Sequence, residues 1–178
     1  MAGYCSEHAL WKMLVDLSSE ILADFNKANF LTPYMVLVDG ENFRVAEDKD
    51  YMPTSEFFPP EGIDQLTEAG LVWMLGALIC YASSGHYIFG GRGGRYQKEK
   101  PGVELPRLKK EHSALTDLVR RCLCYFPLQR ISLKDLQTAA KKGLDSNEQM
   151  SRLKQSNKSV ASNDSTEYIV DVWPEKMG

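Results

Sequence analysis

Apolar residues recur every three or four positions near the start of the chain. This spacing places them on one side of a helix of about five turns, because an α-helix completes a turn in about 3.6 residues. The pattern therefore predicts an amphipathic helix that begins at Ser6 and buries one side in a core. The apolar positions on that side are Leu10, Met13, Leu14, Leu17, Ile21, Leu22 and Phe25.

A short segment that follows has the pattern of a β-hairpin. An apolar run precedes the dipeptide Asp39-Gly40, and Phe43 and Val45 alternate with polar residues after it. This dipeptide is typical of a tight turn between twisted strands, because such turns need positive φ angles. Residues 35–46 therefore predict two antiparallel strands. The next segment, 47–62, is rich in proline and has no period, so it predicts a loop.

The pattern predicts three more helices. The helix over 64–83 is apolar on nearly all sides in its second half, so we expect it at the centre of the core. After the glycine-rich residues 83–102, which predict a loop, comes an amphipathic helix over 111–124. The last helix begins at Ser132, whose hydroxyl can accept a hydrogen bond from a free amide of the first turn. The apolar faces of the last two helices comprise Leu115, Leu118, Val119, Cys122 and Leu123, and Leu133, Leu136, Ala139, Ala140 and Leu144.

The chain changes character after Leu144. Residues 145–164 are polar and predict a linker, whereas 168–173 have high strand propensity. We therefore expect a helical domain over 1–144, a linker over 145–164 and a tail over 165–178. The tail contains a candidate docking strand that would pair with the edge of the hairpin, with a disordered terminus as the alternative. Its residues are Tyr168, Ile169, Val170, Val172 and Trp173.

Composition excludes some functions. The net charge of -3 argues against general binding of nucleic acid or acidic membranes, which depends on neutralising phosphates. The longest apolar run, 69–82, has 14 residues, and about 20 are needed to span a bilayer. The first residues do not have the pattern of a signal peptide. We expect a cytoplasmic protein whose four cysteines are reduced packing residues.

The order of these elements and four short motifs resemble the large, C-terminal lobe of the protein kinase superfamily over residues 6–144. The segment LVWMLGALICY, 71–81, is similar to the kinase pattern Asp-Val-Trp-Ser-Leu-Gly and the apolar half-helix after it. SGHYIFGG, 84–91, resembles the Gly-x-x-Pro-Phe turn that follows in kinases. PPEG resembles the Ala-Pro-Glu motif, and 118–136 resembles the stretch leading into the last helix. The matching residues are Glu61, Trp73, Leu75, Gly76, Pro127, Arg130 and Ser132. The resemblance implies a mainly α fold with a small β-hairpin, like a kinase C-terminal lobe without the small lobe.

The resemblance also implies that the kinase catalytic groups are missing. Phe30 stands at the position of the catalytic aspartate, Thr32 at that of the lysine and Met35 at that of the metal-binding asparagine. Leu71 replaces a buried aspartate, and Glu47 is the one carboxylate left near the magnesium position. Phosphoryl transfer needs a phosphate cradle, metal ions and a group that orients the hydroxyl. We therefore expect no catalytic residue, no metal ligand and no cofactor, including ATP and magnesium.

Two charged positions are kept where the catalytic ones are lost. In the kinases that this chain resembles, the positions of Glu61 and Arg130 form a buried ion pair. A structural ion pair is therefore implied here too, with a ligand contact as the weaker alternative.

By the same resemblance, the chain looks like a member of the kinase non-catalytic C-lobe domain family, which implies an inactive module that binds a protein or peptide. A face normally covered by the small lobe would be exposed, and the docking strand could cover it. The alternative is a regulatory or structural half of a larger kinase-like assembly, whose small lobe is supplied by another chain or lies upstream. RNA binding through Arg92 and Arg95 of GGRGGR is the least favoured interpretation, because the chain is acidic and one such box is weak evidence. The candidate partner-binding residues are Phe30, Tyr34, Tyr51, Phe57 and Phe58.

Overall fold

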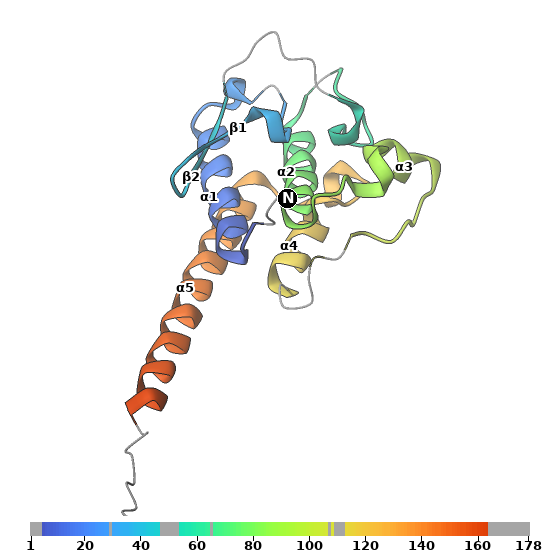
Figure 1. Ribbon diagram of the computed structural model, residues 1–178. Helices are drawn as coiled ribbons and strands as arrows, with labels where there is room; N and C mark the ends of the chain where they lie inside the picture. The colour runs from blue at the N-terminus through green and yellow to red at the C-terminus, as the bar shows by residue number, and fades with distance from the viewer. Residues whose placement is uncertain are drawn as a thin grey trace, which may run out of the picture.

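The computed structural model describes residues 5–28, 30–46, 54–64, 66–106, 108 and 113–163. Within these ranges the protein is mainly α-helical with one two-stranded antiparallel hairpin, as the sequence predicts. Short 3₁₀ turns connect several of the elements (Figure 1). The helices and strands are α1 (Glu7–Ala23), β1 (Val36–Asp39), β2 (Asn42–Val45), α2 (Glu68–Ser84), α3 (Gly93–Glu99), α4 (Ser113–Cys122) and α5 (Leu133–Asn163).

Helix α1 is the predicted amphipathic helix. The Ser6 hydroxyl accepts a hydrogen bond from the Ala9 amide and caps its first turn. One side packs lengthwise on α5, and β2 lies along another side. Two residues of the predicted apolar face, Leu22 and Phe25, are exposed instead. Leu22 comes directly after the buried Ile21, and each residue turns the helix by about 100°, so its side chain points away from the core. Phe25 lies beyond the end of the helix.

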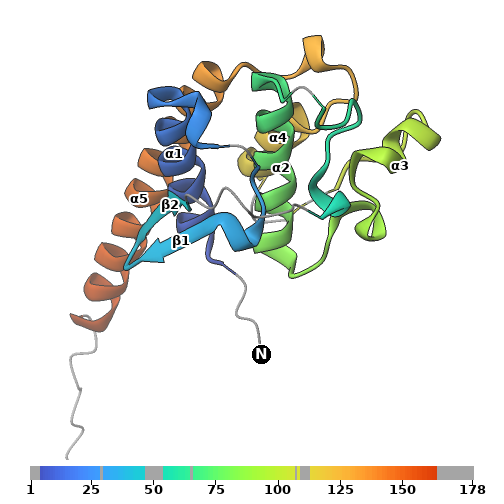
Figure 2. The same ribbon diagram turned by 90° about the horizontal axis from the view of Figure 1, so that it is seen from above.

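Helix α2 forms the centre of the core, and Figure 2 shows it between α1 on one side and α3 on the other. It begins at Glu68, later than predicted, because the Thr67 hydroxyl caps it by accepting a hydrogen bond from the Gly70 amide. Residues 70–80 are buried without exception. Helix α2 therefore carries apolar residues on all its sides because other elements surround it.

Helix α3 lies inside the segment that the sequence predicts to be a loop, so that prediction is wrong for residues 93–99. The first two helical residues, Gly93 and Gly94, are buried against a neighbouring segment. The Gly94 amide donates a hydrogen bond of 2.8 Å to the Phe58 carbonyl. The tertiary contact stabilises a helix start that glycine alone disfavours.

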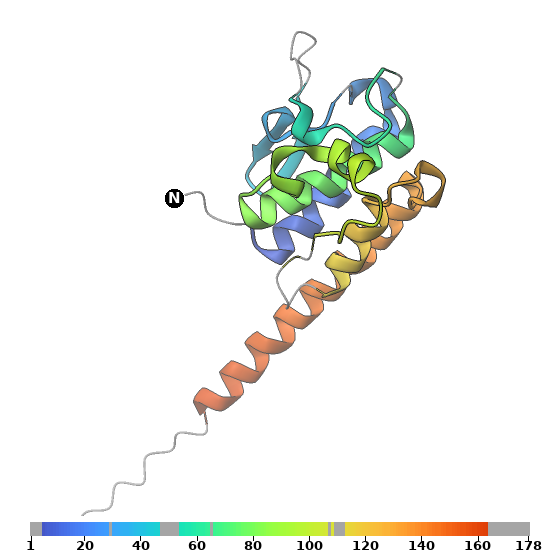
Figure 3. The same cartoon turned by 90° about the vertical axis from the view of Figure 1, so that its right-hand side faces the viewer.

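Helix α5 is much longer than predicted. It runs for 31 residues, through the segment expected to be a linker, so the predicted end of regular structure at Leu144 is wrong. Residues 145–163 contain no proline or glycine, and many are good helix formers. The Ser146 and Ser151 hydroxyls donate to carbonyls one turn earlier in the helix. Figure 3 shows that this half of α5 projects beyond the body of the domain. The tail over 165–178 lies outside the described residues, and the division into domains stays a prediction.

The hairpin has the predicted position, but its turn lies one residue later than the predicted Asp39-Gly40. Val38 pairs with Phe43, and Asp39 pairs with Asn42. The turn residues are Gly40 and Glu41, and Gly40 has a φ of 60°, which is the position that a type II′ turn reserves for glycine. Asp39 itself belongs to the strand. Within the described ranges, each helix is too short or too polar to cross a lipid bilayer.

Candidate functional site

The positions compared with the kinase catalytic groups are mostly buried. Thr32, Met35 and Leu71 have almost no exposed surface, and Phe30 is half-buried against the core. The side chains of Phe30, Met35 and Leu71 are apolar, so these three positions contribute packing and offer no polar group. Glu47 lies outside the described residues. Within the described part of the chain, no three His, Cys, Asp or Glu side chains are grouped so that they could hold a metal ion.

The predicted ion pair between Glu61 and Arg130 is present. The Arg130 Nη1 atom lies 2.5 Å from Glu61 Oε1, and its Nη2 atom lies 2.7 Å from Glu61 Oε2, so the contact is bidentate. The guanidinium also donates to the backbone carbonyls of Ala69, Cys124 and Tyr125. The Arg130 side chain is 0% exposed. All the guanidinium donors are used internally, so Arg130 links three segments of the fold and offers no donor to a ligand.

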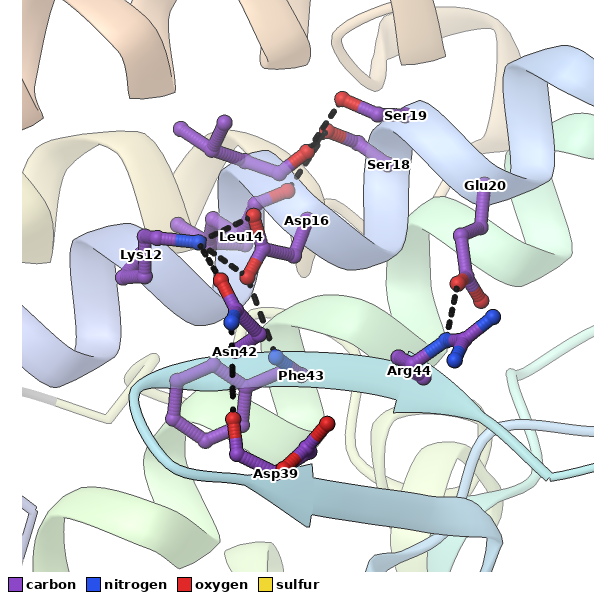
Figure 4. A network of polar contacts seen from close by, with 11 residues as sticks. Lys12, Leu14, Asp16, Ser18, Ser19, Glu20, Asp39, Asn42, Phe43 and Arg44 are labelled. Carbon is purple, nitrogen blue, oxygen red and sulfur yellow. Dashed lines mark hydrogen bonds and ion pairs between the residues drawn. The ribbon is translucent and has the colours of Figure 1, made fainter.

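One edge of the hairpin is closed by α1 (Figure 4). The Phe43 amide donates to the Asp16 carboxylate at 3.0 Å, and the Val45 amide donates to the Glu20 carboxylate at 2.7 Å. Lys12 holds Asp16 in place with an ion pair of 2.6 Å. The amides along the outer edge of β2 are therefore satisfied, and a further strand cannot pair there.

The other edge, along β1, is open. Among the described residues β2 is the only strand that pairs with β1. The turn makes Asp39 and Asn42 a hydrogen-bonded pair, so the backbone groups of Val38 point away from β2. The side chains along this edge are apolar and exposed: 72% for Tyr34, 54% for Leu37 and 65% for Val38. Together these three residues form what we call the β1 edge.

An aromatic cluster forms where helix α2 ends. The Tyr81 and Tyr87 rings stack with centroids 5.0 Å apart, and Phe57 contacts both rings edge to face. Partial burial, followed by the charges of Tyr81, Tyr34 and Glu56, raises the pKa of the Tyr87 phenol. Tyr87 is 39% exposed, so the cluster presents aromatic surface to solvent.

The structure separates the predicted partner-binding residues. Tyr34 is exposed, but Phe57 is 3% exposed, so its prediction as a partner contact is wrong: its ring packs beneath Tyr81 and Tyr87. Phe30 and Phe58 are half-buried. Tyr51 lies outside the described residues, as do all five residues of the candidate docking strand, Tyr168, Ile169, Val170, Val172 and Trp173.

Sequence reasoning missed four exposed or partly exposed residues of this surface. They are Leu37, Val38, Tyr81 near the end of α2, and Tyr87 just after it. A signal for the first two was present, because 36–38 are consecutive apolar residues in a hairpin. Neighbouring side chains in a strand point to opposite faces, and a two-stranded hairpin on a domain surface buries one face only. At least one residue of that run therefore had to face solvent.

The two arginines of the GGRGGR segment make local contacts. The Arg92 guanidinium lies 3.9 Å from the Tyr96 ring centroid and 3.2 Å from the Glu99 carboxylate, and Arg95 lies 2.9 Å from the same carboxylate.

The four cysteines are unpaired. Burial raises the pKa of the Cys80 thiol to about 12 and also raises that of Cys122, so both thiols are protonated packing groups.

Comparison of the chain with models of protein families and with curated proteins finds no match. The features of this chain that bear on its function are therefore the motifs quoted above, the β1 edge and the aromatic cluster.

Proposed function

We propose that this chain is a catalytically inactive protein-interaction module, built like the large lobe of a protein kinase. The observation that carries the interaction role is the β1 edge, where an unpaired strand edge and three exposed apolar side chains coincide. An exposed edge of this kind is costly for a protein that leaves it free, because it pairs readily with other strands. A partner that covers it is therefore the simplest role for this surface.

The partner best suited to the β1 edge is an extended peptide segment. Its backbone would bond the outward amide and carbonyl of Val38, and its side chains would lie on Leu37 and Tyr34. The stacked rings of Tyr81 and Tyr87 would add contact area at the end of the strand, since aromatic side chains often dominate binding surfaces. Backbone pairing would supply affinity, and the aromatic face would supply selectivity.

Two features support the likeness to a kinase lobe. The bidentate pair of Glu61 and Arg130 joins the positions that the kinase motifs predict, and the helix that carries Trp73 and Gly76 is buried along its length. Phe30, Met35 and Leu71 occupy positions where kinases hold catalytic or supporting polar groups. On this proposal the lobe is kept as a scaffold.

The interaction role is tested by closing the β1 edge. Val38→Pro removes the outward amide without removing a hydrogen bond of the hairpin. We expect it to lower by at least about tenfold, or about 1.4 kcal/mol, the affinity for extended peptides selected from a displayed library. Leu128→Lys is the matched control, because Leu128 is fully exposed on the turn before α5. Equal binding by the wild type and both variants would contradict the role of the edge. A stoichiometric complex with a small-lobe-like chain, found by native mass measurement, would favour the larger assembly instead.

The inactive state gives a second prediction. Magnesium and ATP at millimolar concentration are expected to leave the melting temperature unchanged, because a ligand that binds the folded state tightly stabilises it by mass action. The side chains of Phe30 and Met35 offer no group that binds a phosphate-bound magnesium ion. The measurement is a thermal-shift titration with magnesium alone as the control. A rise of several degrees with magnesium and ATP together would contradict the prediction.

A further inference from the structure

Strand β1 exposes apolar side chains on both of its faces. Val38 lies directly opposite Phe43 in the hairpin, so these two side chains share the core-facing side. Phe43 is 7% exposed there, whereas Val38 is 65% exposed. Leu37 points to the opposite side and is 54% exposed. A strand that covers the β1 edge therefore needs apolar residues on both of its own faces.

The backbone of the β1 edge can bond such a strand over a short length. Because Asp39 and Asn42 form a hydrogen-bonded pair, the backbone groups of Val36 and Val38 point away from β2. The Val36 amide is already bonded to the Pro33 carbonyl. The Val38 amide and the carbonyls of Val36 and Val38 remain for an added strand.

Helix α1 sets the level of the hairpin along α5. Gln137 of α5 donates a hydrogen bond to Ser19 of α1, and Gly143 of α5 lies against Trp11 of α1. Two carboxylates on this stretch of α1 accept the hydrogen bonds of the β2 amides. The hairpin therefore lies level with about residues 137–143 of α5.

The projecting half of α5 carries the end of the chain away from that level (Figure 3). From Gly143 to the helix end at Asn163 is about 30 Å at about 1.5 Å per residue, and from Gln137 it is about 39 Å. An extended chain spans at most about 3.5 Å per residue, so Tyr168 lies within about 18 Å of the helix end and Trp173 within about 35 Å. Even a fully stretched segment would bring only its last residue back to the hairpin. The segment 167–173 therefore cannot pair along the β1 edge of its own chain.

We propose that the segment 167–173 of one copy of the chain pairs with the β1 edge of a second copy. This inference names the peptide partner of the proposed function, and it rests on that function. When the segment is extended, successive side chains point to opposite faces. Both faces then carry apolar residues, which are Tyr168, Val170 and Val172 on one and Ile169 and Trp173 on the other.

The two faces of the segment match the two sides of β1. The wholly apolar face suits the core-facing side, where Val38 is uncovered. The other face also carries Asp171 and suits the side of Leu37. Arg44 is the cross-strand neighbour of Leu37, and its side chain is 67% exposed beside Glu20. A carboxylate of the added strand on that side would meet an accessible guanidinium.

Each copy of the chain carries one such edge and one such segment. After the first segment of a pair has docked, the second contact forms within the complex, where its effective concentration is high. Reciprocal exchange of the two segments closes the assembly at two copies related by a two-fold axis. The projecting half of α5 is then the arm that presents the segment to the partner.

The test measures the molar mass of the full chain by light scattering over a range of concentrations. The wild type is expected to rise from one chain to two. Val38→Pro removes the outward amide of the edge, and Ile169→Pro/Val170→Pro removes an inward amide of the segment in either pairing register. Each variant alone is expected to stay a single chain. The matched control Ser165→Pro/Thr166→Pro places the same two prolines before the segment and should still form pairs.

Mixing the two variants separates exchange between copies from a contact within one chain. Val38→Pro retains an intact segment, and Ile169→Pro/Val170→Pro retains an intact edge. An equal mixture is therefore expected to form a complex of two chains, which neither variant forms alone. The complex should be weaker than the wild-type pair, because only one of the two contacts is present.

Three results would overturn the inference: a wild type that stays a single chain up to about 1 mM, pairs that survive in both variants, or a mixture that remains single chains. Failure of the inference is separable from failure of the proposed function. If the wild type stays a single chain while Val38→Pro still loses affinity for the selected peptides, only the inference is wrong. If those peptides bind Val38→Pro and the wild type equally, the proposed function is wrong and the inference falls with it.

Discussion

Replacing Arg130 by methionine is expected to lower the free energy of unfolding by about 3 to 5 kcal/mol, because removing one partner of a buried pair leaves an uncompensated charge. The methionine fills much of the space but donates no hydrogen bond. Glu61 loses both of its short contacts, and the carbonyls of Ala69, Cys124 and Tyr125 lose a donor. We therefore expect the loop before α2, the start of α2 and the turn after α4 to lose stability.

The matched control is Arg95→Met. Arg95 is 82% exposed and pairs with Glu99 at the surface, and such pairs contribute about 1 kcal/mol or less. Urea unfolding of the wild type and both variants decides the prediction, since a lower midpoint at unchanged slope reports lost stability. Midpoints that agree for Arg130→Met and Arg95→Met would show that the buried pair does not stabilise the fold.

Replacing Gly94 by alanine is expected to cost about 2 to 3 kcal/mol, at the upper end of the usual cost of overpacking. A Cβ atom at this position would lie 2.2 Å from the Pro60 nitrogen and 2.4 Å from the Pro59 carbonyl carbon. These are backbone atoms of proline residues, which cannot turn aside as the end of a side chain can. The start of α3 would have to move away, and the hydrogen bond from the Gly94 amide to Phe58 would weaken.

Gly70→Ala is the control for this substitution. Gly70 lies in the first turn of α2, and a Cβ atom there would meet its nearest neighbours at 3.5 Å, an ordinary contact. Alanine is favoured over glycine in a helix by about 0.5 to 1 kcal/mol, so this variant should equal or exceed the wild type in stability. The melting temperatures of the two variants give the comparison. A Gly94→Ala protein as stable as Gly70→Ala would show that α3 can shift at little cost.

Local patterns were enough to predict most of the elements. The three-and-four spacing of Leu10, Leu14 and Leu17 placed α1, and Asp39-Gly40 placed the hairpin to within a residue. These predictions succeed because a helix or a hairpin with one buried face repeats its apolar positions at the period of its own backbone. The pair of Glu61 and Arg130 was found differently, by motif resemblance, since nothing local to either residue indicates a partner so far along the chain.

The candidate site was only partly predictable. Tyr34 was expected at the surface and is exposed there, but Phe57 was expected with it and lies in the core. Both are aromatic residues in segments without a period, so composition treats them alike. Only the position of Tyr81 and Tyr87 over Phe57 distinguishes them, and that position depends on how the segment after α2 packs.

The amino-acid sequence by itself determined the helical class, the amphipathic faces of α1 and α4, the central place of α2 and the turn at Gly40, because each follows from backbone periodicity or from the conformational needs of one residue. Tertiary structure decided the rest. It made a helix of the glycine-rich residues 93–99, since the close approach of Gly94 to Pro60 exists only after folding. It closed the β2 edge with carboxylates from α1 and left the β1 edge open, because only the folded arrangement brings α1 beside β2 and not beside β1.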